Sequence, residues 1–235
     1  MIKKPVIAFL LDKKGGAIEL SYEELNNVNT NGKILWVHFD YSSPEAVDWI
    51  TNKSEIDSIA IDALLTEETR PRTTLLNDSI LIALRGVNLN PNSKPEDMVS
   101  IRLYISTHLI ISTRKRDILS VAEIIDILKK GIGPKSSSEF LTELIYRVTD
   151  RMEDVINQIE DRTNALEENL IDSTDLKFRN EILSVRREII ILRRYLFPQK
   201  EALNKLYNDK ITWINEYERI EIRETNGQLM RHIEE

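Results

Sequence analysis

Three histidines are the main candidates for metal or proton chemistry, because the chain has no cysteine and so no thiolate ligand. His38, His108 and His232 lie far apart in the sequence. His38 and His108 fall in strand-like segments, where a structural role is the favoured interpretation and a metal or proton role is the alternative. The chain has no nucleophile-elbow, zinc-protease, Walker or dinucleotide-binding pattern. The sequence therefore predicts that the protein is not an enzyme.

The carboxyl-terminal segment offers a better arrangement for a metal ion. His232 has Glu235 three positions later and Gln228 four positions earlier, so helical geometry puts these side chains on one side. Imidazole and carboxylate groups bind zinc, but one chain supplies too few of them for a complete site. The candidate metal ligands are His232, Glu235, Glu224 and Glu221. A solvated helix face is the alternative interpretation of the same polar stripe.

Arginines form further clusters that could meet an anion. Arg70, Arg72 and Arg85 are one group, and residues 114–116 form another. No glycine-rich loop joins them, so salt bridges and solvated charge are favoured, with phosphate binding as the alternative. The chain carries 32 basic and 39 acidic side chains, a net charge of −7, which disfavours nucleic acid as a partner.

The elements that carry these residues divide the chain into two regions. With 41% apolar and 30% charged residues, the chain has the composition of a folded protein. No apolar run approaches the ~20 residues that a bilayer crossing needs. Residues 1–135 alternate short strand-like and helix-like runs, which predicts an α/β head domain with a mixed sheet. Strands are expected near residues 6–11, 17–20, 33–40, 73–76, 79–84, 98–106 and 108–113, and short helices near 44–50, 55–65 and 117–130.

Residues 136–235 have apolar side chains at steps of three and four, the spacing of long packed helices. We expect a helical hairpin at about 138–197. Pro198 lacks an amide donor and is expected to end or kink its second helix. A long stalk helix is then expected at about 199–235. The arginine pairs at 186–187 and 193–194 flank an isoleucine-rich face, which favours helix packing over lipid recognition. The fold class is thus α/β or α+β, a mixed-sheet head followed by long antiparallel helices.

The stretch from Leu84 to Arg102 is the most distinctive part of the chain. It reads LRGVNLNPNSKPEDMVSIR and joins two strand-like runs through residues that favour turns. An ordinary loop closing an antiparallel pair would explain the turn residues but not the whole string. Its distinguishing residues, which we expect to be structural, are Arg85, Gly86, Asn88, Asn90, Pro91, Pro95, Glu96, Asp97 and Met98.

This stretch carries a family resemblance. LRGVNLNP and PEDMVSIR, with WVHFDY at 36–41, ETRPR at 68–72 and RRYLFPQ at 193–199, resemble the cytoplasmic part of ZntB-type zinc transporters in the CorA superfamily. The resemblance implies a homopentameric funnel at the cytoplasmic side of a bacterial inner membrane, with one long helix per subunit lining the pore. It also implies Zn²⁺ as the transported ion, no organic cofactor, and a region with two membrane spans that is expected after residue 235.

The resemblance supplies a functional hypothesis and a symmetry. Around a symmetry axis, the stripe of candidate ligands would form rings of oxygen and imidazole groups that attract divalent cations. We therefore expect the chain to draw cations to a pore and to contribute to gating and oligomerisation. The alternatives are the cytoplasmic domain of a CorA-type magnesium or cobalt transporter, and a non-transport α/β scaffold with a helical oligomerisation arm.

Overall fold

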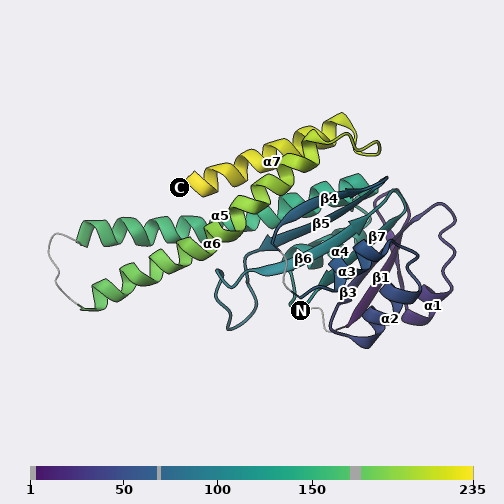
Figure 1. Ribbon diagram of the computed structural model, residues 1–235, viewed down its shortest axis with the longest axis horizontal. Coiled ribbons are helices and arrows are strands. Elements are labelled where there is room, and N and C mark those ends of the chain that lie inside the picture. Colours follow the sequence, from purple (N-terminus) through teal and green to yellow (C-terminus); the bar gives the residue numbers. More distant parts are fainter. Residues whose placement is uncertain (1–3, 68–69, 170–175, 235) are drawn as a thin grey trace.

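Seven apolar runs of the chain form one mixed sheet in the computed structural model, which describes residues 4–67, 70–169 and 176–234. The strands are β1 (Val6–Leu11), β2 (Ala17–Leu20), β3 (Ile34–Asp40), β4 (Arg72–Leu76), β5 (Ser79–Gly86), β6 (Val99–Ile105) and β7 (Leu109–Arg114). Their order is β2-β1-β3-β7-β6-β5-β4. Strands β3 and β7 run parallel and the other neighbours antiparallel (Figure 1). The predicted mixed-sheet head is confirmed.

Helices cover both faces of this sheet, which explains why its strands are apolar at successive positions rather than at alternate ones. Phe9 and Trp36 belong to the apolar core of one face, and Val37 and Phe39 to that of the other. The first core includes α4 (Leu119–Lys129), α5 (Ser137–Asn169), α6 (Leu176–Asn208) and α7 (Glu216–Glu234). The second includes α1 (Tyr22–Asn26), α2 (Pro44–Asn52) and α3 (Ser58–Leu65).

Local side-chain contacts set where the short helices begin. Ser43 caps α2 by accepting the Ala46 amide at 3.2 Å, and Pro44 follows it as predicted. Helix α3 begins three residues later than expected. Glu55 has a φ of 55°, outside the helical range, and the Asp57 carboxylate caps the helix instead. The sequence prediction missed α1, although Ser21 and Glu24 form a capping box at its start.

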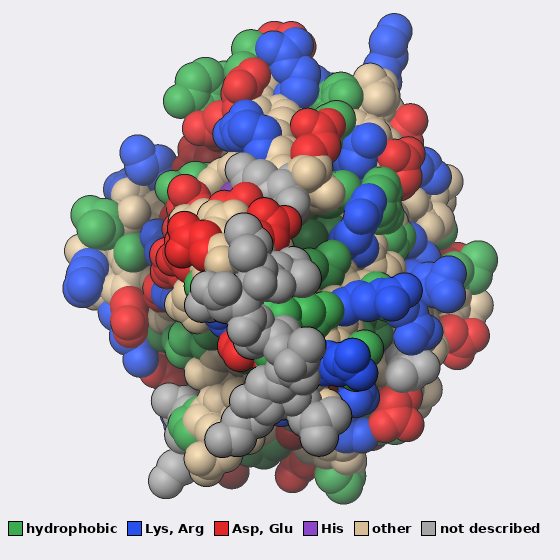
Figure 2. Space-filling view, turned by 90° about the vertical axis from the view of Figure 1, so that its left-hand side faces the viewer, with side chains coloured by type: hydrophobic (Ala, Val, Ile, Leu, Met, Phe, Trp, Pro, Cys, Tyr) green, Lys and Arg blue, Asp and Glu red, His purple; other side chains and the backbone are tan. Residues whose placement is uncertain are grey.

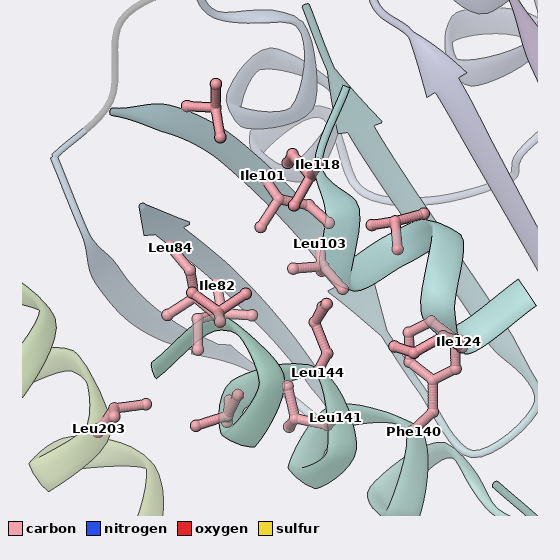
Figure 3. Close-up of a cluster of buried hydrophobic side chains, with 14 of the residues drawn as sticks. Ile82, Leu84, Ile101, Leu103, Ile118, Ile124, Phe140, Leu141, Leu144 and Leu203 are labelled. Atoms are coloured by element: carbon pink, nitrogen blue, oxygen red, sulfur yellow. The ribbon is translucent and has the colours of Figure 1, made fainter. Parts of the chain in front are cut away.

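The first half of α5 packs against the sheet on its first face. Phe140, Leu141 and Leu144 are buried beneath Ile82 and Leu103 of the sheet (Figure 3). The second half of α5 and the first half of α6 extend beyond the sheet as a hairpin (Figure 1). Within the described ranges, no helix has both the length and the apolar run that a bilayer crossing needs.

The expected bounds of the hairpin at about 138–197 and of the stalk helix at about 199–235 are wrong. Helix α6 continues through Pro198 to Asn208, and α7 begins only at Glu216. Contacts with the sheet hold α6 together beyond the proline. The Arg85 amide donates to the Gln199 side chain at 2.7 Å, and the Thr73 hydroxyl donates to the Ala202 carbonyl at 2.8 Å. The division of the chain near residue 135 stays a prediction, since sheet and long helices share one core.

A turn at 209–215 separates α6 from α7. The Arg219 guanidinium donates to the carbonyls of Tyr207, Asp209 and Ile211 at 2.6 to 3.1 Å, satisfying groups that the end of α6 leaves exposed. Asn215 and Glu218 form a reciprocal capping box, with each side chain accepting the other's amide at 2.8 to 3.0 Å. This Asn-Glu-Tyr-Glu string stands in the sequence and could have located the start of α7.

Replacing Leu144 by alanine tests how far the sheet depends on α5. Leu144 is fully buried, so we expect Leu144→Ala to lower the free energy of unfolding by about 2–5 kcal/mol. Leu119→Ala is the matched control, because Leu119 is 42% exposed and should change stability by less than about 0.5 kcal/mol. Urea denaturation followed by circular dichroism measures both, and equal effects would contradict the role given to α5.

Candidate functional site

The predicted metal ligands of α7 line two different hollows. Glu221, Glu224 and Gln228 line a hollow between α7, the start of α5 and the α4–α5 connection. His232 lines a second hollow, which lies between the carboxyl-terminal end of α7 and the middle turns of α5 and α6. Glu235 lies outside the described residues. The structure therefore brings Glu221 and Glu224 together and separates them from His232.

The first hollow, called here the acidic hollow, has a volume of about 1050 Å³. Its carboxylates are Glu139, Glu143, Glu218, Glu221 and Glu224, and its cationic side chains are Lys135, Arg147 and Arg231. Neighbouring groups already engage part of this set. Arg147 binds Glu143 at 2.6 Å, and buried Glu218 accepts the Ser138 hydroxyl at 2.7 Å.

The two carboxylates on α7 are the accessible part of the acidic hollow. Glu221 is half-buried and Glu224 is exposed, with Arg223 3.6 Å from the latter. Gln228 donates to Glu153 of α5 at 3.3 Å, so its amide is turned toward α5. In the described part of the chain, no group of three or more histidine, aspartate or glutamate side chains is placed to hold an ion. Among the described residues, the acidic hollow thus offers carboxylates but no complete metal site.

The second hollow, called here the apolar groove, has a volume of about 530 Å³. Apolar side chains of α5 and α6, such as Ile159 and Leu192, line it together with polar and charged ones, and Ile233 closes it from α7. His232 is half-buried at its edge. Glu160 and Glu234 also line this groove, but no group of three or more histidine, aspartate or glutamate side chains in the described residues is placed to provide the four ligands, or three and a water, of a zinc site.

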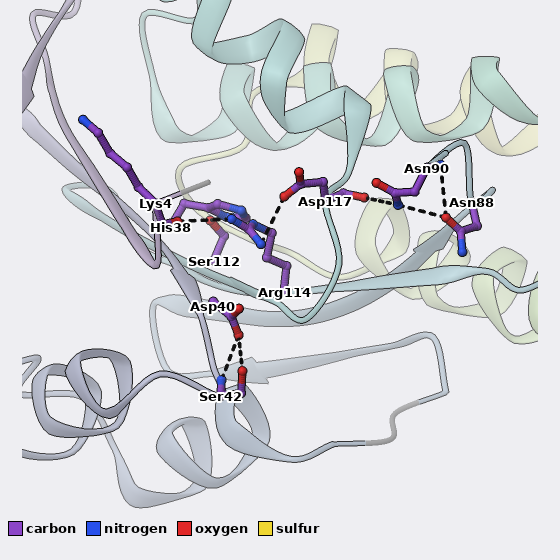
Figure 4. Close-up of polar contacts among 9 residues, drawn as sticks. All are labelled: Lys4, His38, Asp40, Ser42, Asn88, Asn90, Ser112, Arg114 and Asp117. Atoms are coloured by element: carbon purple, nitrogen blue, oxygen red, sulfur yellow. Dashed lines mark hydrogen bonds and ion pairs between the residues drawn. The ribbon is translucent and has the colours of Figure 1, made fainter. Parts of the chain in front are cut away.

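The loop between β5 and β6 is held by the side chain of Asn88, which is buried. Its amide donates to the Asp97 carbonyl at 3.0 Å, and its carbonyl oxygen accepts both the backbone and the side-chain amide of Asn90. The Asn90 side chain also donates to the Asp117 carbonyl at 3.0 Å, just before α4 (Figure 4). Two asparagines thereby tie the loop to itself and to the helix layer.

The same loop also touches the long helices. The Arg85 guanidinium donates to the Met98 carbonyl at 3.1 Å and lies over the Tyr195 ring at 4.6 Å. Lys94, Pro95 and Glu96 border a hollow formed with Arg162 of α5 and Glu188 of α6. These contacts account for several of the residue types that distinguish the stretch from Leu84 to Arg102. That this stretch is structural stays a prediction.

His38 is buried inside the sheet rather than placed for metal binding. Its Nδ1 lies 2.8 Å from the Ser112 hydroxyl (Figure 4). The same hydroxyl also accepts the Trp36 indole N–H at 2.9 Å. Burial lowers the pKa of His38 well below its usual value, and the nearby charge of Arg114 lowers it further. Arg114 itself is paired with Asp117 at 3.1 Å. His38 is therefore a neutral core histidine at neutral pH.

The remaining sequence candidates are dispersed. His108 is exposed near the start of β7, and Arg70 and Arg72 are exposed. The sequence interpretation overlooked Arg102, whose buried guanidinium lies 4.6 Å from the Tyr41 ring centre and donates to the Glu67 carbonyl. Arg102 stands among the apolar residues of β6, and a charged residue within such a strand could have indicated a buried, paired side chain.

Comparisons with known proteins identify the family and relatives of this chain. Residues 31–235 match the family model described as CorA-like Mg²⁺ transporter protein. The zinc transport protein ZntB of Yersinia enterocolitica is 31% identical over 234 residues, which are 100% of this chain and 70% of that protein. The divalent cation transporter CmaX of Pseudomonas aeruginosa is 35% identical over 233 residues, 98% of this chain and 70% of its own.

Solved structures show the same fold. Full-length CmaX matches with a TM-score of 0.89 and 34% identity, over 99% of this chain and 72% of that one. The ZntB cytoplasmic domain from Vibrio parahaemolyticus matches with a TM-score of 0.76 and 23% identity, over 97% and 91% of the two chains. The predicted fold class, a mixed-sheet head with long helices, is confirmed by these neighbours.

The neutral state of His38 predicts a specific pH dependence of stability. Below a pH of about 6.5, the unfolded chain binds a proton at this histidine that the folded chain does not bind. The contribution of His38 to stability is therefore complete above that pH. It is lost as the pH falls, by up to about 1.4 kcal/mol per pH unit.

Urea unfolding between pH 7.5 and 5.5 measures this slope. His38→Gln should flatten it, whereas His108→Gln, at an exposed histidine, should leave the wild-type slope unchanged. An identical slope in wild type and His38→Gln would contradict the assignment.

Proposed function

Because the chain belongs to the CorA-like Mg²⁺ transporter family, we propose that it is the cytoplasmic funnel domain of a zinc or related divalent cation transporter. In this role it attracts cations to a pore and contributes to oligomerisation and gating. The proposal places the chain in a homopentamer at the cytoplasmic side of a bacterial inner membrane. Two relatives support the proposal, because they match 100% and 98% of this chain. This chain covers 70% of the length of each of them.

The pair Glu221 and Glu224 on α7 is the observation that carries the proposal. These carboxylates line an open hollow of a chain whose net charge is −7, so the local potential favours cations. Repeated around a symmetry axis, they would form rings with several oxygen ligands, which one chain lacks. Occupancy of such rings would favour one packing of neighbouring α7 helices over another, which is a mechanism for gating.

Zinc is the proposed cargo because the zinc transport protein ZntB of Yersinia enterocolitica matches the whole chain at 31% identity. Magnesium is the second candidate, since the family description names it. The chemistry of the hollow bears on this choice. Oxygen ligands alone suit hard cations such as Mg²⁺, while imidazole favours zinc. Preference for zinc would therefore require His232, which lies in the other hollow, to join the carboxylates in the assembly.

Isothermal titration of the purified chain with ZnCl₂ and with MgCl₂ tests the proposal. We expect the double variant Glu221→Gln/Glu224→Gln to bind either ion at least about tenfold more weakly, since even outer-shell groups carry an effect of that size. The matched control is Glu23→Gln/Glu45→Gln, which removes two exposed carboxylates on the opposite side of the sheet and should bind like wild type.

A third variant tests whether zinc or magnesium is the preferred ion. His232→Ala should weaken zinc binding and leave magnesium binding unchanged if zinc is the preferred ion. Equal affinities for wild type and Glu221→Gln/Glu224→Gln would contradict the role of α7. An unchanged zinc affinity in His232→Ala would remove His232 from the site.

A further inference from the structure

The two helices of the hairpin carry opposite charge. Helix α5 has nine carboxylates against three arginines, while residues 178–208 of α6 have seven basic side chains against three acidic ones. The charges recur at the same interval. Acidic pairs stand at 153–154, 160–161 and 167–168, and arginine pairs at 186–187 and 193–194. Viewed along the hairpin, acidic side chains gather left of centre and basic ones, mixed with hydrophobic ones, on the right (Figure 2).

Large apolar side chains lie exposed between the arginines of α6. Leu183, Ile190 and Phe197 are 60%, 57% and 45% exposed and are seven residues apart, so they form one line along the helix. Helical geometry places Arg187 and Arg194 on one side of this line and Arg186 and Arg193 on the other. We call these seven residues the α6 seam. An apolar line between charged rows is the pattern of a helix that packs against another helix.

The arginines of the seam have no ionic partner within the described ranges of the chain. Arg193 lies over the Phe197 ring at 5.3 Å, and Arg194 lies over Tyr195 at 5.8 Å. The ion pair between the two helices of the hairpin uses other residues, Arg162 and Glu188, at 2.6 Å. Among the residues that the structure describes, the hairpin therefore does not neutralise the charge of the seam.

Helix α5 presents a matching surface. Asp154, Asp161 and Glu168 are exposed, stand seven residues apart and share one side of the helix. We call them the acidic row. None of the three has an ion pair among the described residues. The row repeats at the interval of the arginines on α6, roughly 10 Å along a helix axis.

We propose that the α6 seam of one copy docks against the acidic row of α5 in a second copy. The inference rests on the proposed oligomerisation and names a contact that would mediate it. Two seams would not pair with each other, because their arginines would repel. A contact between two different surfaces is heterologous, and repetition of such a contact closes a ring when the rotation between copies allows it. Each copy then contributes one seam and one row.

An anionic lipid surface also has charge that suits the arginines, but the hairpin disfavours it. Helix α5 lies beside α6 and carries a net charge of −6, so a negatively charged membrane would repel half of the same hairpin. A second copy satisfies both helices, because it offers a basic surface to α5 and an acidic one to α6.

Charge reversal and rescue test this contact by sedimentation velocity of the chain at low salt. We expect Arg187→Glu/Arg194→Glu to weaken self-association at least about tenfold, because like charges then face each other. Asp154→Arg/Asp161→Arg should weaken it similarly. The chain with all four changes should return to within about threefold of wild type, because the charges are exchanged rather than removed. The matched control, Arg72→Glu/Arg116→Glu, reverses two exposed arginines elsewhere and should associate like wild type.

The outcomes separate this inference from the proposed function. A wild-type chain that stays monomeric at every concentration would contradict both the oligomerisation and the contact. Two outcomes would contradict the contact alone. In one, neither charge reversal changes the self-association of the chain; in the other, combining the two reversals does not restore it. Co-sedimentation with phosphatidylglycerol vesicles covers the lipid interpretation. Vesicle binding that Arg187→Glu/Arg194→Glu abolishes, with self-association unchanged, would overturn the proposal and assign the seam to lipid.

Discussion

The burial of the first half of α5 against the sheet is the contact on which the rest of the structure depends. Phe140, Leu141 and Leu144 fill the face of the sheet between α4 and α6. Helix α5 has 33 residues, a length of roughly 50 Å, so fixing one half also orients the other. The fixed half forms a wall of the acidic hollow, and its Ser138 binds Glu218 at the start of α7. The projecting half carries the acidic row.

The distribution of charge on one chain bears on the proposed assembly. A single chain concentrates carboxylates at the acidic hollow and on α5, and its described residues hold no group of three or more ligands for an ion. Neighbouring carboxylates repel one another, and nearby cations reduce this repulsion; Arg147, for example, pairs with Glu143. In the proposed assembly, groups from neighbouring copies would complete the coordination of a cation and would neutralise the α6 seam. The proposed function and the inferred contact therefore depend on the same symmetry.

The sequence predicted the head far better than the long helices. Strand positions followed from apolar runs and turn residues, because two covered sheet faces leave a strong pattern. Pro198 misled the prediction because its local cost is overcome by contacts of Gln199 and Ala202 with distant strands, which no local pattern reveals. Ile211 and Ile214 continued the apolar spacing of a helix, yet they are buried in the turn before α7. The candidate site was only partly predictable, since packing of α7 between α5 and α6 splits its polar stripe into two hollows.

The central claim is that divalent cations collect at the carboxylates of α7. Crystals of the chain grown with zinc, measured at the zinc absorption edge, locate the bound ions by anomalous scattering without assumptions about affinity. The account predicts anomalous density within coordination distance of Glu221 or Glu224, about 2.0–2.2 Å from a carboxylate oxygen. Density confined to other surfaces, with these two carboxylates unoccupied at saturating zinc, would contradict it.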